Sequence, residues 1–109
     1  MFKSLLILLL SAFLLFSCSK KNNEEVSADV TEEDLAVKAY TEAVNALKEG
    51  DAFYAAKKFK ETENLLPQSK WAAKASLMAS YAEYSRNSYA ESVYGLNRFI
   101  KNYPSDENI

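Results

Sequence analysis

The 109-residue sequence has no histidine, one cysteine, two glycines and two prolines. Without histidine and with a single thiol, the chain cannot build the usual zinc sites, a Ser-His-Asp triad or an intramolecular disulfide. It also lacks a strong excess of one charge, since 13 Lys+Arg stand against 15 Asp+Glu for a net charge of −2. This balance argues against nucleic acid as a partner. The scarcity of glycine and proline favours helices, and the length allows one small domain.

The first 18 residues are typical of a secreted lipoprotein. Lys3 precedes an uncharged apolar run over residues 5–16. The run is shorter than the roughly 20 residues of a transmembrane helix and matches the apolar region of a signal peptide. Leu15, Ser17 and Cys18 fit the box of bacterial lipoprotein signals, which are cleaved before the cysteine. Residues 1–17 are therefore predicted to be a signal peptide.

Cys18 is the predicted lipidation site. Its sulfur would take a diacylglyceryl group and its freed amine a further acyl chain, and two or more chains anchor a protein stably. The alternative is an incidental cysteine behind an ordinary secretory signal. Ser19 stands where lipoproteins kept at the inner membrane often have aspartate. These features predict an outer-membrane lipoprotein that faces the periplasm, with no cofactor besides the covalent lipid.

The segment after the cysteine is polar and has no hydrophobic period. Residues 18–30 therefore predict a flexible tether between the lipid and a folded domain. The positive charges of Lys20 and Lys21 could contact lipid headgroups, but a solvated tether is the favoured interpretation.

From residue 31 onward the sequence has helical periodicity. It predicts four helices, which run from Thr31 to about Glu49, from about 52 to 65, from Gln68 or Ser69 to about Ser85, and from Ser88 to just before Pro104. Thr31 and Asp51 are expected to be N-caps, Gly50 to end the first helix, and Ser88 with Glu91 to form a capping box. Because the turns are short, consecutive helices should be antiparallel. The predicted fold class is all-α.

Each predicted helix carries an apolar stripe. The first two stripes contain Ala36, Tyr40, Ala43, Val44 and Leu47, and then Ala55, Ala56, Phe59 and Leu66. The third helix is apolar on two sides and should lie between neighbours; the sides are Trp71, Ala75, Met78 and Ala82, and Leu77, Tyr81 and Tyr84. The stripe of the fourth helix contains Tyr89, Val93, Leu96, Phe99 and Ile100.

The two helix pairs repeat with a spacing of 37 residues. The matched positions are Gly50-Asp51 and Asn87-Ser88, Ala55 and Ser92, Phe59 and Leu96, and Pro67 and Pro104. A small residue, a large apolar residue four later and a proline eight after that resemble the second half of a tetratricopeptide repeat. The prediction is one repeat over residues 31–67, a second over 68–104, and the start of a truncated further repeat at 105–109. An unrelated four-helix bundle is the alternative.

Two stretches, taken with the lipoprotein signal, resemble one family. They are Ala-Tyr-x-x-Ala-x-x-Ala-Leu-x-x-Gly-Asp over 39–51 and Leu-Asn-Arg-Phe-Ile-Lys-Asn-Tyr-Pro over 96–104, and they are similar to the BamD family, lipoproteins of the complex that folds β-barrels into the bacterial outer membrane. The resemblance implies a non-enzymatic scaffold that binds other subunits of that complex and C-terminal segments of unfolded outer-membrane proteins. Family members have about five repeats, so this sequence would be an N-terminal part.

Two other classes of function are alternatives. A generic periplasmic repeat lipoprotein, such as a pilus-assembly or cell-envelope adaptor, would share the signal and the repeats. A hydrolase with paired carboxylates is disfavoured because Glu61 and Glu63 face different directions on a helix. The lysines at 57, 58 and 60 are more typical of a solvated helix face than of a nucleic-acid site.

Stacked hairpins leave a concave groove lined by the first helix of each pair. The predicted groove residues are Tyr40, Val44, Lys48, Lys74, Leu77, Tyr81 and Tyr84. Tyrosines offer apolar area with a hydroxyl that can pair with peptide backbone, and Lys48 or Lys74 could meet a terminal carboxylate. The alternative for Tyr81 and Tyr84 is simple packing between hairpins.

Overall fold

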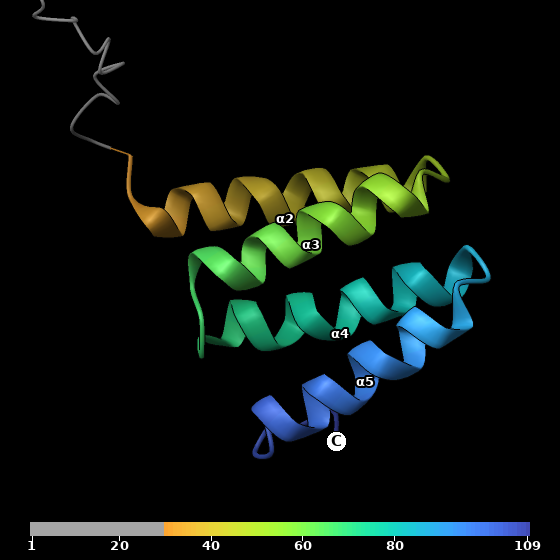
Figure 1. Ribbon diagram of the computed structural model, residues 1–109. Helices are drawn as coiled ribbons and strands as arrows, with labels where there is room; N and C mark the ends of the chain where they lie inside the picture. Colours follow the sequence, from red (N-terminus) through yellow and green to blue (C-terminus); the bar gives the residue numbers. More distant parts are fainter. Residues whose placement is uncertain (1–29) are drawn as a thin grey trace, which may run out of the picture.

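The computed structural model describes residues 30–109 and contains four helices in that range (Figure 1). They are α2 (Glu32–Lys48), α3 (Ala52–Leu65), α4 (Lys70–Ser85) and α5 (Tyr89–Asn102). Each bound lies close to the one predicted from the sequence, and the described residues include no strand. The all-α fold of paired helices is confirmed. The predicted signal peptide and most of the tether, residues 18–29, lie outside the described residues.

Local sequence explains where three of the helices begin. The side chain of Thr31 accepts the Asp34 N–H at 3.1 Å, and Asp34 accepts the Thr31 N–H in return at 3.0 Å, which makes a capping box. Asp51 accepts the Tyr54 N–H at 3.0 Å. Ser69 accepts the Ala72 N–H at 3.0 Å, so the third helix begins at the second of the two predicted caps.

The predicted capping box at Ser88 is wrong, because Ser88 makes no side-chain cap hydrogen bond. Its ψ of 66° resembles the 71° of Asp51 and not the extended 161° of Thr31. At this angle the longer aspartate side chain still reaches the helix, whereas the serine hydroxyl does not. The turn is closed by Asn87, whose φ is 64°, and by the Ser88 N–H, which donates to the Glu83 carbonyl at 2.9 Å.

The helices stack in chain order. Helix α2 packs on α3, α3 on α4 and α4 on α5, and α2 also contacts α4. By contrast, the backbones of α3 and α5 do not approach each other. Figure 1 shows both hairpin turns, near Gly50 and near Asn87, at the same end of the stack. The first helices of the two pairs are therefore neighbours on one side, while the second helices are separated by a gap on the other.

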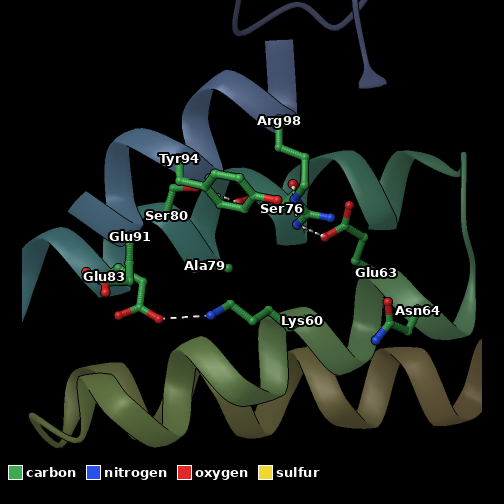
Figure 2. Close-up of a pocket in the computed structure, with 11 residues that line it drawn as sticks. Lys60, Glu63, Asn64, Ser76, Ala79, Ser80, Glu83, Glu91, Tyr94 and Arg98 are labelled. Carbon is green, nitrogen blue, oxygen red and sulfur yellow. Dashed lines mark hydrogen bonds and ion pairs between the residues drawn. The ribbon is translucent and has the colours of Figure 1, made fainter. Parts of the chain in front are cut away.

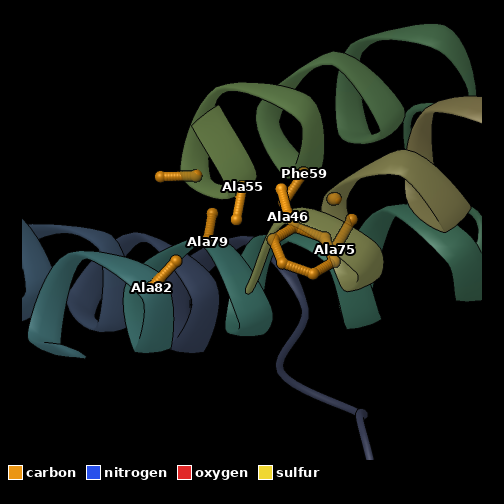
Figure 3. Close-up of a cluster of buried hydrophobic side chains, with 8 residues drawn as sticks. Ala46, Ala55, Phe59, Ala75, Ala79 and Ala82 are labelled. Atoms are coloured by element: carbon orange, nitrogen blue, oxygen red, sulfur yellow. The ribbon is translucent and has the colours of Figure 1, made fainter. Parts of the chain in front are cut away.

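The main core is built from alanines around one aromatic ring. Phe59 is completely buried, and small side chains from α2, α3 and α4 surround it (Figure 3). These are Ala43, Ala46, Ala55, Ala56, Ala75, Ala79 and Ala82. Small residues let helix backbones approach closely, and the ring then fills the remaining space. Ala55 and Phe59, both on the predicted stripe of α3, are buried.

The predicted stripe of α5 is only partly correct. Phe99 is buried in a second cluster with Ala72, Ala73 and Tyr103. The other members of the stripe are exposed, and they are Tyr89, Val93, Leu96 and Ile100. Among the described residues only α4 packs on α5. The apolar side of α5 that faces away from α4 is therefore uncovered.

Candidate functional site

The predicted groove residues fall into two classes in the structure. On α4, four of them share one stripe at helical spacing, and these are Lys74, Leu77, Tyr81 and Tyr84. On α2 the three are Tyr40, Val44 and Lys48. The structure buries part of this set in the junction between the helices and leaves the rest exposed.

Tyr40 lies at the junction between the two helix pairs. Its ring packs edge-on against Phe59, with centroids 5.3 Å apart, and against Trp71, with centroids 5.2 Å apart. The Lys74 ammonium stands 5.6 Å from the centre of the same ring. Edge-to-face rings and a cation over a ring face both stabilise such a junction. The structure thus brings Tyr40 and Lys74 together, and Tyr40 acts mainly in packing.

Val44 and Leu77 are also half-buried packing residues. Val44 packs against the main core and Leu77 against the second cluster around Phe99. Lys48, in contrast, is exposed in the last turn of α2. Val44 and Leu77 therefore contribute more to packing beneath the predicted groove than to its exposed surface.

Tyr81 and Tyr84 are the exposed aromatic residues of the predicted groove. They are 54% and 59% exposed, so they do not pack between hairpins of the described residues. The ring of Tyr84 lies 5.6 Å from that of Tyr89 at the start of α5. The two tyrosines therefore present apolar ring faces and hydroxyls at the end of α4 nearest the hairpin turn.

The opposite end of α4 carries two lysines. Lys70 and Lys74 are one helical turn apart, and with Leu77 and Met78 they line a cavity of about 650 Å³. Asp106 and Glu107 line the other side of this cavity. Lys70 was not among the predicted groove residues, although its spacing of four from Lys74 was a visible signal. The structure thus gives the α4 surface a cationic end and an aromatic end.

A second polar site lies between α3, α4 and α5 and was missed from the sequence. Glu63 is buried and pairs with Arg98 from α5, which also donates to the Ser76 hydroxyl at 3.4 Å. The Tyr103 hydroxyl donates to the other carboxylate oxygen of Glu63 at 2.9 Å. Burial is the main cause that raises the pKa of Tyr103 to about 12, and the hydrogen bond to the Glu63 carboxylate is the second. Arg98 and Tyr103 belong to the stretch that resembles the family, and here they join the two helix pairs through Glu63.

Glu83 is the second buried carboxylate of this region (Figure 2). Lys60 lies 2.9 Å from one of its oxygens and Arg86 lies 2.8 Å from the other. Burial raises the pKa of Glu83, but the hydrogen bonds from Lys60 and Arg86 outweigh it and hold this pKa below its usual value. Glu83 is therefore ionised at neutral pH and fully paired. Neither buried carboxylate is available as a general acid or base.

The described residues offer little for metal chemistry or for spanning a membrane. Residues 30–109 contain no group of three or more side chains suited to hold a metal ion. Within the same range, no helix combines the length and the apolar character that crossing a bilayer requires.

Comparison with known proteins places this arrangement in a family. The family model YfiO, described as an outer membrane lipoprotein, matches residues 32–109. The chain belongs to this family. One relative is the outer membrane protein assembly factor BamD of Caulobacter vibrioides, which is 36% identical over 67 residues. The match covers 62% of this chain and 22% of the relative, so the chain spans about a fifth of that protein's length. No solved structure matches the chain.

Membership of the YfiO family confirms the predicted location at the outer membrane and the resemblance seen in residues 39–51 and 96–104. The predicted lipidation of Cys18 lies outside residues 30–109 and stays a prediction. The division into repeats at 31–67 and 68–104 also stays a prediction, although each range contains one helix pair.

Proposed function

We propose that this YfiO-family chain is a non-enzymatic scaffold of outer-membrane protein assembly. Its α2/α4 face would bind C-terminal segments of unfolded outer-membrane proteins, and other surfaces would bind subunits of the β-barrel assembly complex. The name of the relative, an outer membrane protein assembly factor, supports a role in that assembly process. The observation that carries the proposal is the surface of α4, where exposed Tyr81 and Tyr84 share a stripe with Lys74.

The spacing on α4 suits an extended peptide with an alternating aromatic pattern. Tyr81 and Tyr84 are seven and ten residues from Lys74, which corresponds to about 10 and 15 Å along a helix. Side chains on one face of an extended peptide recur about every 6.7 Å. A terminal carboxylate at Lys74 would thus place side chains two and four residues upstream, at about 7 and 13 Å, near the two tyrosine rings.

The cation for the carboxylate is better assigned to Lys74 than to Lys48. Lys74 shares its cavity with Lys70, so two ammonium groups lie at this end of α4, and Asp106 and Glu107 already line the facing wall. Lys48 stands at the C-terminal end of α2, where the helix dipole already provides it with negative potential. An exposed ion pair contributes only about 0.2–1 kcal/mol, so the aromatic contacts must supply most of the affinity.

Lipid at Cys18 would hold this surface at the periplasmic side of the outer membrane. The residues between Cys18 and Thr31 are mostly polar, and the predicted tether would raise the effective concentration of the site near membrane-bound partners. No reaction is required of the protein, because positioning alone serves the proposed role.

Titration of a labelled C-terminal peptide tests this function. The peptide has alternating aromatic residues and a terminal phenylalanine, and the mature chain is kept in detergent micelles. Replacing both exposed tyrosines, Tyr81→Ala with Tyr84→Ala, should raise the Kd about tenfold, since two aromatic contacts of about 0.5–1.5 kcal/mol each are lost. Tyr40 is unsuited to this test because its ring packs against Phe59 and Trp71.

The matched control is Tyr94→Ala, which removes a 72% exposed tyrosine from α5. This variant should bind the peptide as the unmodified chain does. Equal Kd values for the double variant, the control and the unmodified chain would remove the α4 tyrosines from the binding site.

A further inference from the structure

A cleft opens on the side of the molecule where α3 and α5 fail to meet. Its volume is about 380 Å³, and its residues come from three helices (Figure 2). Lys60, Glu63 and Asn64 of α3 form one wall, and Glu91, Tyr94 and Arg98 of α5 form the other. The side of α4 that lines this cleft is not the side that carries Lys74, Tyr81 and Tyr84.

Small residues form the floor of the cleft. Ser76, Ala79 and Ser80 of α4 form the floor, and Gly95 of α5 lies beside them. A Cβ atom at Gly95 would overlap the Ser80 hydroxyl, so only glycine allows this close approach of α5 to α4. The Ser92 hydroxyl donates to the Ser80 carbonyl at 2.9 Å and fixes the same contact. These two contacts fix the α5 wall against the α4 floor.

In the described part of the chain, some charged side chains that line the cleft already have ion-pair partners, and one does not. Lys60 and Arg98 are engaged by the buried carboxylates of Glu83 and Glu63. Glu91 is exposed in the first turn of α5, and within residues 30–109 it has no ion-pair partner within 4.0 Å. Tyr94 lies one turn further along the same wall and is 72% exposed. The α5 wall thus presents a free carboxylate next to an open aromatic ring.

This arrangement favours a cation over an anion as the occupant. An anion would have to draw Lys60 or Arg98 away from a buried carboxylate, and an unpaired charge in such a site is strongly unfavourable. A cation meets Glu91 without breaking an existing ion pair. A planar guanidinium can bind a carboxylate through two parallel hydrogen bonds and stack on a tyrosine ring, which a lysine ammonium cannot do.

We propose that the α3/α5 cleft is a docking site for an arginine side chain of a partner protein, held by Glu91 and Tyr94. The site is separate from the peptide-binding face on α4 and does not depend on it. Arginine and tyrosine are both enriched where protein surfaces bind each other, which suits a scaffold with more than one partner.

The test is NMR titration of the isotope-labelled mature chain in detergent micelles. The probe is the blocked tripeptide Ala-Arg-Ala, and the control probe has citrulline, a neutral isostere, in place of arginine. The arginine probe should cause saturable shifts of the amide signals of Glu91, Tyr94 and Gly95, with a Kd at least fivefold lower than that of the citrulline probe. Ala-Lys-Ala should bind more weakly than Ala-Arg-Ala.

Variants complete the test. Glu91→Gln should abolish the preference for arginine over citrulline, whereas Glu49→Gln, an exposed carboxylate on α2, should leave it unchanged. The spectra of both variants also report whether the fold is intact. Absence of saturable shifts, equal binding of the arginine and citrulline probes, or a lysine probe that binds as tightly as arginine would each overturn the proposal.

Discussion

Helices α3 and α5 occupy matching positions in the two helix pairs but differ in what covers them. Ala55 and Ser92, which are 37 residues apart, are both buried. Phe59 is 0% exposed, whereas its counterpart Leu96 is 38% exposed. The difference arises because α4 packs on the far side of α3, and no described helix does so for α5. Equivalent sequence positions therefore differ in burial according to their neighbours, as in repeat proteins, where each unit completes the core of the last.

The largest expected effect is at the two matched apolar positions. Phe59→Ala should lower the free energy of unfolding by about 3–5 kcal/mol, because it leaves a cavity in the alanine core. Leu96→Ala removes a side chain that is already partly in water, so it should cost less than about 1.5 kcal/mol. Urea unfolding of the two variants measures both values. Similar losses would show that the two helices are equally covered.

The next largest effect is at the contact that joins the pairs. Glu63→Gln should destabilise the fold by about 2 kcal/mol, because Arg98 loses its charged partner in a largely buried site. Glu61→Gln, two residues away but exposed, should cost less than about 0.5 kcal/mol. Urea unfolding again provides the measurement. A loss for Glu63→Gln as small as the control's would contradict a stabilising role for this ion pair.

The two glycines extend the comparison to the backbone. Gly95→Ala should cost about 1–3 kcal/mol by overpacking, since its Cβ would overlap Ser80. Adding Ser80→Ala should restore part of this loss, because it removes the hydroxyl in the way. Gly50→Ala should cost about 1 kcal/mol for a different reason, its φ of 88°, and Ser80→Ala should not restore it. Thermal unfolding of the single and double variants would show whether the rescue is specific.

A further expected effect appears only at alkaline pH. The pKa of Tyr103 is raised from 10.0 to about 12, so the folded state holds this proton more tightly than the unfolded state. The resulting stability is complete below pH 10 and is lost as the pH rises toward 12. Tyr103→Phe keeps a ring beside Phe99 and should show a shallower loss of stability over this range. Parallel denaturation curves for the two proteins between pH 9 and 12 would contradict this account.

Much of the fold was predictable because its determinants are local. Capping residues such as Thr31 and Asp51, the glycine at 50 and the stripes of alanine fix the four helices without reference to distant parts of the chain. The failure at Ser88 has a local cause as well, but it depends on a backbone angle that the sequence does not display.

The candidate sites were harder to predict because they depend on register between helices. Tyr40 and Tyr81 were both predicted to line the groove, yet in the structure Tyr40 is half-buried against rings from α3 and α4 and Tyr81 is exposed. The pairing of Glu63 with Arg98 joins residues 35 apart, and no periodic signal marks it. Alternating charges on a helix are ordinarily solvated, so buried carboxylates had no distinguishing sequence feature.

The most direct test of the proposed function uses the end of the client peptide. The account predicts that a peptide with a free C-terminal carboxylate binds the mature chain several-fold more tightly than its C-terminal amide. It also predicts that this difference disappears in Lys70→Gln with Lys74→Gln, while both peptides still bind through Tyr81 and Tyr84. Fluorescence anisotropy with the two peptides and the two proteins gives the four Kd values required. Equal binding of acid and amide by the unmodified chain would contradict the placement of the carboxylate, and no binding of either would contradict the function.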